Sequence, residues 1–314
     1  MLPVIPAPLR ASSGQGSFRF ATGTRVAYAD PSLAPIVERF CTEVMRRTGI
    51  WCEPARATRK LAPDVSLIRV EVARDTELDE LPAADGVSPA ALGACDERHV
   101  LSINGDGAGD RIVVRGVEPV GAARGLTTLV QLLATATPDD DGAIELPAAH
   151  IADAPRFAWR SLAVDLGRRF FTVAEVKRVI DLVALYKLNV LQLHVTDDHT
   201  NAELRELIAY ARARFVTLVA ETSPGPASVS PANAGPVVVS PVDHAYFDVP
   251  EAEAWSDPHT GSWSDHRDRL TAHRRLWEQD ELTYFISSAQ AAWPAVSADP
   301  SSTTATILEA EAQP

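Results

Sequence analysis

The sequence lacks any long apolar run. No stretch of its 314 residues approaches the roughly 18 to 20 consecutive apolar residues that a membrane-spanning helix needs, so we predict no transmembrane helix. The opening residues, MLPVIPAPLR, contain prolines and no basic residue ahead of a short apolar stretch, so they also lack the features of a secretory signal. The default expectation is a cytoplasmic protein that does not use a membrane as its partner.

Basic residues are also in short supply. The chain has 29 Lys and Arg against 42 Asp and Glu, which gives a formal net charge of −13. Binding to phosphates relies on concentrated positive charge, so this balance argues against nucleic acid or an anionic membrane as the main partner. A neutral ligand fits the composition better.

Cysteine is scarce and its spacing is not that of a metal site. The three cysteines, Cys41, Cys52 and Cys95, are an odd number. We expect ordinary reduced thiols, with a disulfide as the alternative, and we assign them no metal and no chemistry.

The first half of the chain mixes strand and helix patterns. Residues 31–49 place Leu33, Ile36, Val37, Phe40 and Val44 at helical spacing and end in arginines and a glycine, which predicts a helix. A second helix is predicted at 119–136, and strands are predicted at 17–29, 66–73, 99–105 and 111–117. The pattern indicates an α+β module over residues 1–150. We expect the acidic segment 137–157 to be a loop that forms its boundary.

The pattern then becomes strand, helix, strand, helix, strand. Strands are predicted at 160–167, 189–195 and 216–221, and helices at 172–188 and 200–215. Each helix opens with a Thr and a Glu three residues later, the sequence pattern of a capping box. Strands that are apolar almost throughout predict a parallel sheet covered by helices. The carboxyl ends of these strands carry four acidic residues: Asp165, Asp197, Asp198 and Glu221.

One long segment resembles a known family. The run PRFAWRSLAVDLGRRFFTVAEVKRVIDLVALYKLNVLQLHVTDD, residues 155–198, resembles the opening of the catalytic barrel of the family 20 glycoside hydrolases, the β-N-acetylhexosaminidases. The preceding module resembles the small α+β domain of that family. The segment PVVVSPVDHAYFDVP, residues 236–250, is similar to a later barrel strand. The resemblance therefore implies an α/β chain with a 1–150 domain and a partial TIM (β/α)8 barrel over 155–314.

The resemblance implies a chemistry. Family members release terminal β-linked N-acetylhexosamines with retention, and the substrate's own acetamido oxygen replaces an enzyme nucleophile. This mechanism needs a carboxylic acid to protonate the leaving oxygen and a second carboxylate to orient the acetamido group. The expected partner is an N-acetylhexosamine carbohydrate, and no metal or cofactor is required.

Four residues match sugar-site positions of the family. Arg168 matches an arginine that holds sugar hydroxyls, for which a guanidinium fork is suited. Asp197 matches an aspartate that partners an active-site histidine. Tyr246 and Asp248 match residues that bind the acetamido oxygen and a hydroxyl. The alternatives are a surface arginine, a helix-capping aspartate and a polar end of an edge strand.

The family's acid pair is missing. Adjacent Asp-Glu pairs occur only at 79–80, 96–97 and 280–281, and none follows an apolar strand and glycines. Ser223 and Pro226 stand where the resemblance calls for an aspartate and a histidine, so Asp197 lacks its expected partner. A full barrel takes about 250 residues, more than follow residue 154. We therefore expect an internally truncated barrel that lacks strands four to six and eight.

Three interpretations stay open from the sequence. The chain is a β-N-acetylhexosaminidase by descent with little or no activity, a non-catalytic N-acetylhexosamine-binding protein, or a remnant in which only the first module is well ordered. The last follows because strands that cannot close a barrel leave unpaired edges and exposed apolar faces.

Overall fold

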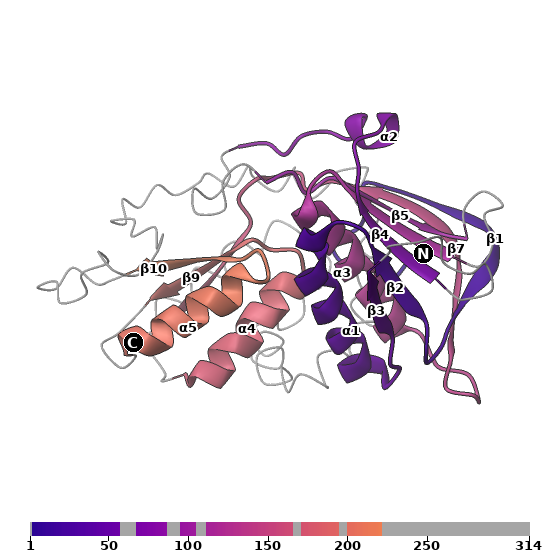
Figure 1. Ribbon diagram of the computed structural model, residues 1–314. Helices are drawn as coiled ribbons and strands as arrows, with labels where there is room; N and C mark the ends of the chain where they lie inside the picture. The colour runs from indigo at the N-terminus through magenta and orange to yellow at the C-terminus, as the bar shows by residue number, and fades with distance from the viewer. Residues whose placement is uncertain are drawn as a thin grey trace, which may run out of the picture. The chain divides into compact units, whose positions relative to one another are not determined.

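The computed structural model describes residues 2–56, 67–86, 95–104, 111–165, 171–194 and 200–221 (Figure 1). Within them the chain forms two sheets. One has seven strands in the order β1-β7-β5-β6-β4-β2-β3, and the other has three in the order β10-β9-β8. The fold of the described residues is therefore mixed α/β.

The first sheet belongs to the predicted α+β module. It is parallel from β3 to β6 and antiparallel from β6 to β1. Its strands are β1 (Arg10–Phe20), β2 (Arg25–Tyr28), β3 (Glu53–Arg56), β4 (Leu67–Val72), β5 (His99–Ile103), β6 (Arg111–Gly116) and β7 (Ile144–Asp153). Its helical segments are η1 (Pro31–Leu33), α1 (Ala34–Thr48), α2 (Thr76–Asp79) and α3 (Pro119–Thr135).

Helices α1 and α3 lie side by side against this sheet. The apolar stripe predicted for 31–49 is confirmed, since Leu33 at the end of η1 and the four residues on α1 are at most 4% exposed, and Gly49 ends the helix in the left-handed conformation. Helix α3 approaches the sheet closely because Gly116 lacks a side chain. A Cβ atom there would lie 2.1 Å from the backbone nitrogen of Ala122.

Two expectations for this module were wrong. Segment 137–157 is not a loop, because it contains β7, which pairs with β1 and β5. Pro147 obscured this strand, but it lies at a register shift opposite β1 and beyond the stretch that pairs with β5, where a missing N–H group is tolerated. Segment 17–29 is two strands, since a turn at Ala21–Thr24 with Gly23 at φ 90° separates β1 from β2.

The three thiols are free. Cys41 on α1 and Cys52 before β3 are buried at 1% and 0% exposure, whereas Cys95 is half-buried. A hydrogen bond with Cys41, together with burial, raises the pKa of the Cys52 thiol. Both buried thiols therefore belong to the core of the first module.

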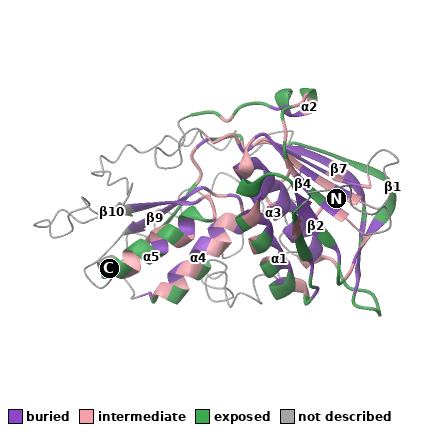
Figure 2. Cartoon of the chain, in the orientation of Figure 1, coloured by how far each residue is buried: buried purple, intermediate pink, exposed green. Residues whose placement is uncertain are grey.

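The second sheet is parallel, as predicted. Its elements are β8 (Ser161–Asp165), α4 (Val173–Leu185), β9 (Val190–His194), α5 (Asn201–Arg212) and β10 (Thr217–Glu221). Both capping boxes are confirmed, with Thr172 and Glu175 opening α4 and Thr200 and Glu203 opening α5. Each helix presents a buried side and an exposed side (Figure 2), and α4 supplies Val176, Val179, Ile180 and Val183 to the core.

Several predictions fall beyond these elements. Residues 222–314 lie outside the described residues, so the strand at 236–250 stays a prediction. The division at 150 and 155 also stays a prediction, although β7 continues to Asp153. Among the helices of the described ranges, none is long and apolar enough to cross a bilayer.

Candidate functional site

The carboxyl ends of the three parallel strands lie in one register. Asp165 on β8 is the partner of His194 on β9, and His194 is the partner of Glu221 on β10. The last residues of β8, β9 and β10 therefore form one row across the sheet. This is the edge at which α/β proteins place binding and catalytic residues.

The predicted site residues follow this row in sequence. Arg168 comes three residues after Asp165, and Asp197 comes three residues after His194. Both, and Asp198 as well, lie outside the described residues, as do Tyr246 and Asp248. Their roles stay predictions. His194 was not among the predicted site residues, and only its backbone pairing places it in this row.

The Asp-Glu pairs of the described residues are far from this row in sequence and have other roles. Asp79 ends α2, and Asp96 binds Arg98 through both carboxylate oxygens. Glu97 is 7% exposed and accepts hydrogen bonds from Arg124 and Arg160 at 2.6 and 2.7 Å. Burial opposes ionisation of Glu97, but the two guanidinium groups outweigh it and hold its pKa below the ordinary value.

The surroundings of Asp96 and Glu97 are not those of a general acid. A proton donor in glycoside cleavage needs a raised pKa and access to the leaving oxygen. Glu97 has a lowered pKa and is enclosed by arginines, and Asp96 likewise has a lowered pKa because Arg98 outweighs its burial. That neither pair supplies the acid stays a prediction.

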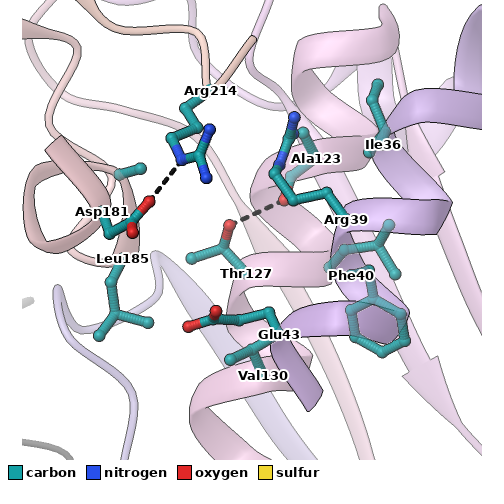
Figure 3. Close-up of a pocket in the computed structure, with 12 residues that line it drawn as sticks. Ile36, Arg39, Phe40, Glu43, Ala123, Thr127, Val130, Asp181, Leu185 and Arg214 are labelled. Carbon is teal, nitrogen blue, oxygen red and sulfur yellow. Dashed lines mark hydrogen bonds and ion pairs between the residues drawn. The ribbon is translucent and has the colours of Figure 1, made fainter. Parts of the chain in front are cut away.

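A cavity of about 80 Å³ lies between α1, α3 and α4 (Figure 3). Its apolar walls include Ile36, Phe40 and Leu185, and its charged residues include Arg39 and Arg214. Arg214 binds Asp181 and stacks on the ring of Tyr210, 3.4 Å from the ring centroid. Burial and the nearby Arg214 and Arg124 lower the pKa of Arg39 to about 10.

This cavity is at the wrong end of the sheet for a sugar site. It reaches Ala184 and Leu185 in the last turn of α4, which leads into the start of β9 rather than its carboxyl end. Its charged groups are also paired or bound to backbone carbonyls. We assign it to packing between the first module and α4.

No group of three or more acidic, histidine or cysteine side chains in the described ranges could hold a metal ion. The candidate site therefore consists of the strand-end row and the predicted sugar-binding residues that follow it in sequence.

Comparison with known proteins adds a family to this geometry. The family model described as glycosyl hydrolase family 20, domain 2, matches residues 1–154, and the one described as glycosyl hydrolase family 20, catalytic domain, matches residues 157–201. Together the two matches cover more than half of the chain.

Individual relatives agree with the family models. A beta-N-acetylhexosaminidase from Cellulomonas fimi is 32% identical over 197 residues, which cover 62% of this chain and 34% of that protein. An N,N'-diacetylchitobiase from Vibrio harveyi is 34% identical over 133 residues, covering 41% of this chain and 14% of that protein.

Solved structures give the same result. A mutant Streptomyces plicatus beta-hexosaminidase in complex with its product GlcNAc is similar with a TM-score of 0.53 and 26% identity, over 70% of this chain and 45% of that one. A beta-N-acetylhexosaminidase from Streptomyces coelicolor is similar with a TM-score of 0.53 and 27% identity, over 70% of this chain and 46% of that one.

The matches share one limit. The chain spans about a third of the length of the first curated relatives it matches, 34% and 30%. The match to the catalytic-domain model ends at residue 201, shortly after the segment that carries Asp197.

Proposed function

This chain belongs to glycosyl hydrolase family 20, and from that premise we propose that its second region is the opening part of a (β/α)8 barrel whose N-acetylhexosamine site lacks a proton donor. In this proposal the chain is a β-N-acetylhexosaminidase by descent that hydrolyses little or nothing. Strands four to six and eight of the ancestral barrel are missing.

The strand-end row carries the proposal. Asp165, His194 and Glu221 align across three parallel strands, so the segments with Arg168 and Asp197 begin at neighbouring positions on one edge. Consecutive strands of a barrel present their catalytic residues in this way. The relatives, which are named hexosaminidases and chitobiase, support an N-acetylhexosamine as the ligand.

The chemistry explains the expected lack of turnover. A glycosidic oxygen must receive a proton as it leaves, and the acetamido group must be oriented and its developing charge balanced. The chain has no Asp-Glu pair after an apolar strand to do this. Removing one preorganised electrostatic group alone raises a barrier by about 2.7 to 4 kcal/mol, so losing two removes most of the catalysis.

Release of p-nitrophenol from the β-N-acetylglucosaminide by the full chain tests this proposal. We expect the background rate for the unmodified chain, for Arg168→Ala and for Arg212→Ala, an exposed arginine at the end of α5 that serves as the matched control. Turnover above background that Arg168→Ala abolishes and Arg212→Ala keeps would show that a proton donor is present after all.

A second candidate is a sugar-binding protein without catalysis. The observation in its favour is that the matched residues which survive, Arg168, Tyr246 and Asp248, are those that hold the sugar rather than those that cleave it. Calorimetry with N-acetylglucosamine tests it, and heat of binding should vanish in Arg168→Ala but persist in Arg212→Ala. The absence of heat at millimolar sugar would exclude this candidate.

A further inference from the structure

Side chains of the first module cap the C-terminal ends of α4 and α5, the two helices that pack on the second sheet. The amide nitrogen of Gln131 on α3 donates to the carbonyl of Leu185, the last residue of α4, at 2.7 Å. Arg39 on α1 donates to the carbonyl of Ala213, the C-cap residue of α5. The last carbonyls of a helix have no partner within it and carry partial negative charge, so these donors stabilise both helix ends.

A buried carboxylate joins the same two regions. Glu97, just before β5, binds Arg124 on α3 and Arg160, the residue before β8. Arg124 also donates to the carbonyl of Phe215, two residues before β10, at 3.4 Å. The side chains of Glu97 and Arg124 are 7% and 4% exposed, so water screens little of this charge.

A second buried ion pair lies beside the first. Asp153, which ends β7, binds the ammonium group of Lys187 in the loop before β9, with 2.8 Å between Oδ2 and Nζ. Between the two pairs lies His99, whose Nδ1 is 2.8 Å from the carbonyl oxygen of Glu97 and whose Nε2 is 3.7 Å from Asp153.

These contacts share one location. Arg160, Lys187 and Phe215 lie one, three and two residues before β8, β9 and β10, so the first module makes contacts next to the amino end of every described strand of the second sheet. The candidate site lies at the opposite, carboxyl ends.

We propose that the first module is the docking base of the second sheet, and that β8 to β10 with α4 and α5 keep their fold only while docked on it. The second sheet has three described strands, and its outer strand β8 leaves Leu162 36% exposed. All-parallel sheets are normally covered on both faces, and within the described ranges the helices that pack with this sheet are α4 and α5, which also pack against each other. The charged contacts then fix which face docks, because an unmatched position would leave buried charges unpaired.

Hydrogen exchange on the full chain tests this proposal. Arg39→Gln removes a first-module donor that reaches the second region through the carbonyl of Ala213, and Arg160→Met removes the cation that reaches Glu97 while leaving Arg124 in place. We expect amides in 200–221 to exchange at least tenfold faster in Arg39→Gln, and amides throughout 161–221 in Arg160→Met. Amides in β4 to β6 should keep their rates.

Arg98→Met is the matched control. Arg98 also forms an ion pair, with Asp96, and donates to carbonyls of Leu78 and Leu81, but all of these partners lie in the first module. It should speed exchange around α2 and leave 161–221 unchanged.

Two outcomes would overturn the proposal. One is protection of 161–221 that survives both Arg39→Gln and Arg160→Met. The other is faster exchange that spreads equally over the first module in these variants. The result does not depend on any sugar or turnover, so it stands apart from the proposed function.

Discussion

The two sheets of this chain reach their stability in different ways. The seven-stranded sheet has its own core under α1 and α3, where residues such as Leu101, Ile112 and Leu129 are fully buried. The three-stranded sheet shares one smaller core with α4 and α5 and leaves three of the residues of β8 exposed. The difference teaches that a small parallel sheet can depend on a neighbouring module that holds the start of its strands.

The largest expected effect comes from two fully buried leucines on central strands, whose replacement tests the difference between the two sheets. Leu101 on β5 and Leu191 on β9 are both 0% exposed, and replacing either with alanine should cost about 2 to 5 kcal/mol. Leu101→Ala should open both sheets, because the docked sheet loses its base. Leu191→Ala should open only the second.

Urea unfolding followed by hydrogen exchange of peptides from each sheet measures both effects. If Leu101→Ala left residues 161–221 fully protected while the first module opened, the two sheets would be independent. The second sheet would then not depend on the first module.

The next largest effect should come from low pH, which should weaken the contacts between the two sheets. Burial, with the nearby Lys187 ammonium group, lowers the pKa of His99 to about 4, against about 6.5 when the chain is unfolded. The unfolded chain therefore takes up a proton more readily, and stability is lost as pH falls from about 6.5 to about 4, by up to about 3 kcal/mol. Asp153 and Glu97 act in the same direction at lower pH, because their ion-pair partners outweigh burial and lower their pKa values.

Urea midpoints between pH 7 and pH 4 check this prediction. The variant His99→Gln keeps a donor for the carbonyl of Glu97 but does not titrate, so its stability should fall less steeply over that range. An identical slope in the variant and the unmodified chain would assign the acid sensitivity to other groups.

The smallest effect should come from a helix cap. Thr172 accepts a hydrogen bond from the backbone of Glu175, and the Glu175 carboxylate accepts one from the backbone of Thr172. Thr172→Ala should cost about 1 kcal/mol. Thr42→Ala is the control, since Thr42 is exposed within α1 and its hydroxyl only donates to the carbonyl of Glu38. Equal losses of stability in Thr172→Ala and Thr42→Ala, measured by thermal unfolding, would show that the cap makes no contribution of its own.

Local patterns predicted much of the fold. The stripes of α1 and α4 and both capping boxes are properties of neighbouring residues, so the sequence shows them directly. Strand β7 was missed because Pro147 and the acidic residues before it are typical of loops, and only its pairing with β1 and β5 makes it a strand.

The site was only partly predictable, for a different reason. The end-of-strand positions of Asp165 and Glu221 follow from the alternation of strands and helices, and their alignment with His194 follows from parallel pairing. The roles of Glu97 and Asp153 could not be inferred, because a buried charge is recognisable only once its distant partners, Arg160 and Lys187, are known. Arg168, Asp197, Tyr246 and Asp248 stay predictions.

The thiols of the first module give this chain a built-in reporter. Cys41 and Cys52 are both enclosed, the pKa of the Cys52 thiol is raised, and only a thiolate reacts readily with alkylating reagents. Iodoacetamide should therefore modify them only as fast as the first module opens, and each molecule that opens retains a permanent mark. Counting alkylated Cys41 and Cys52 by mass spectrometry therefore records how often the first module opens, with no probe added to the protein.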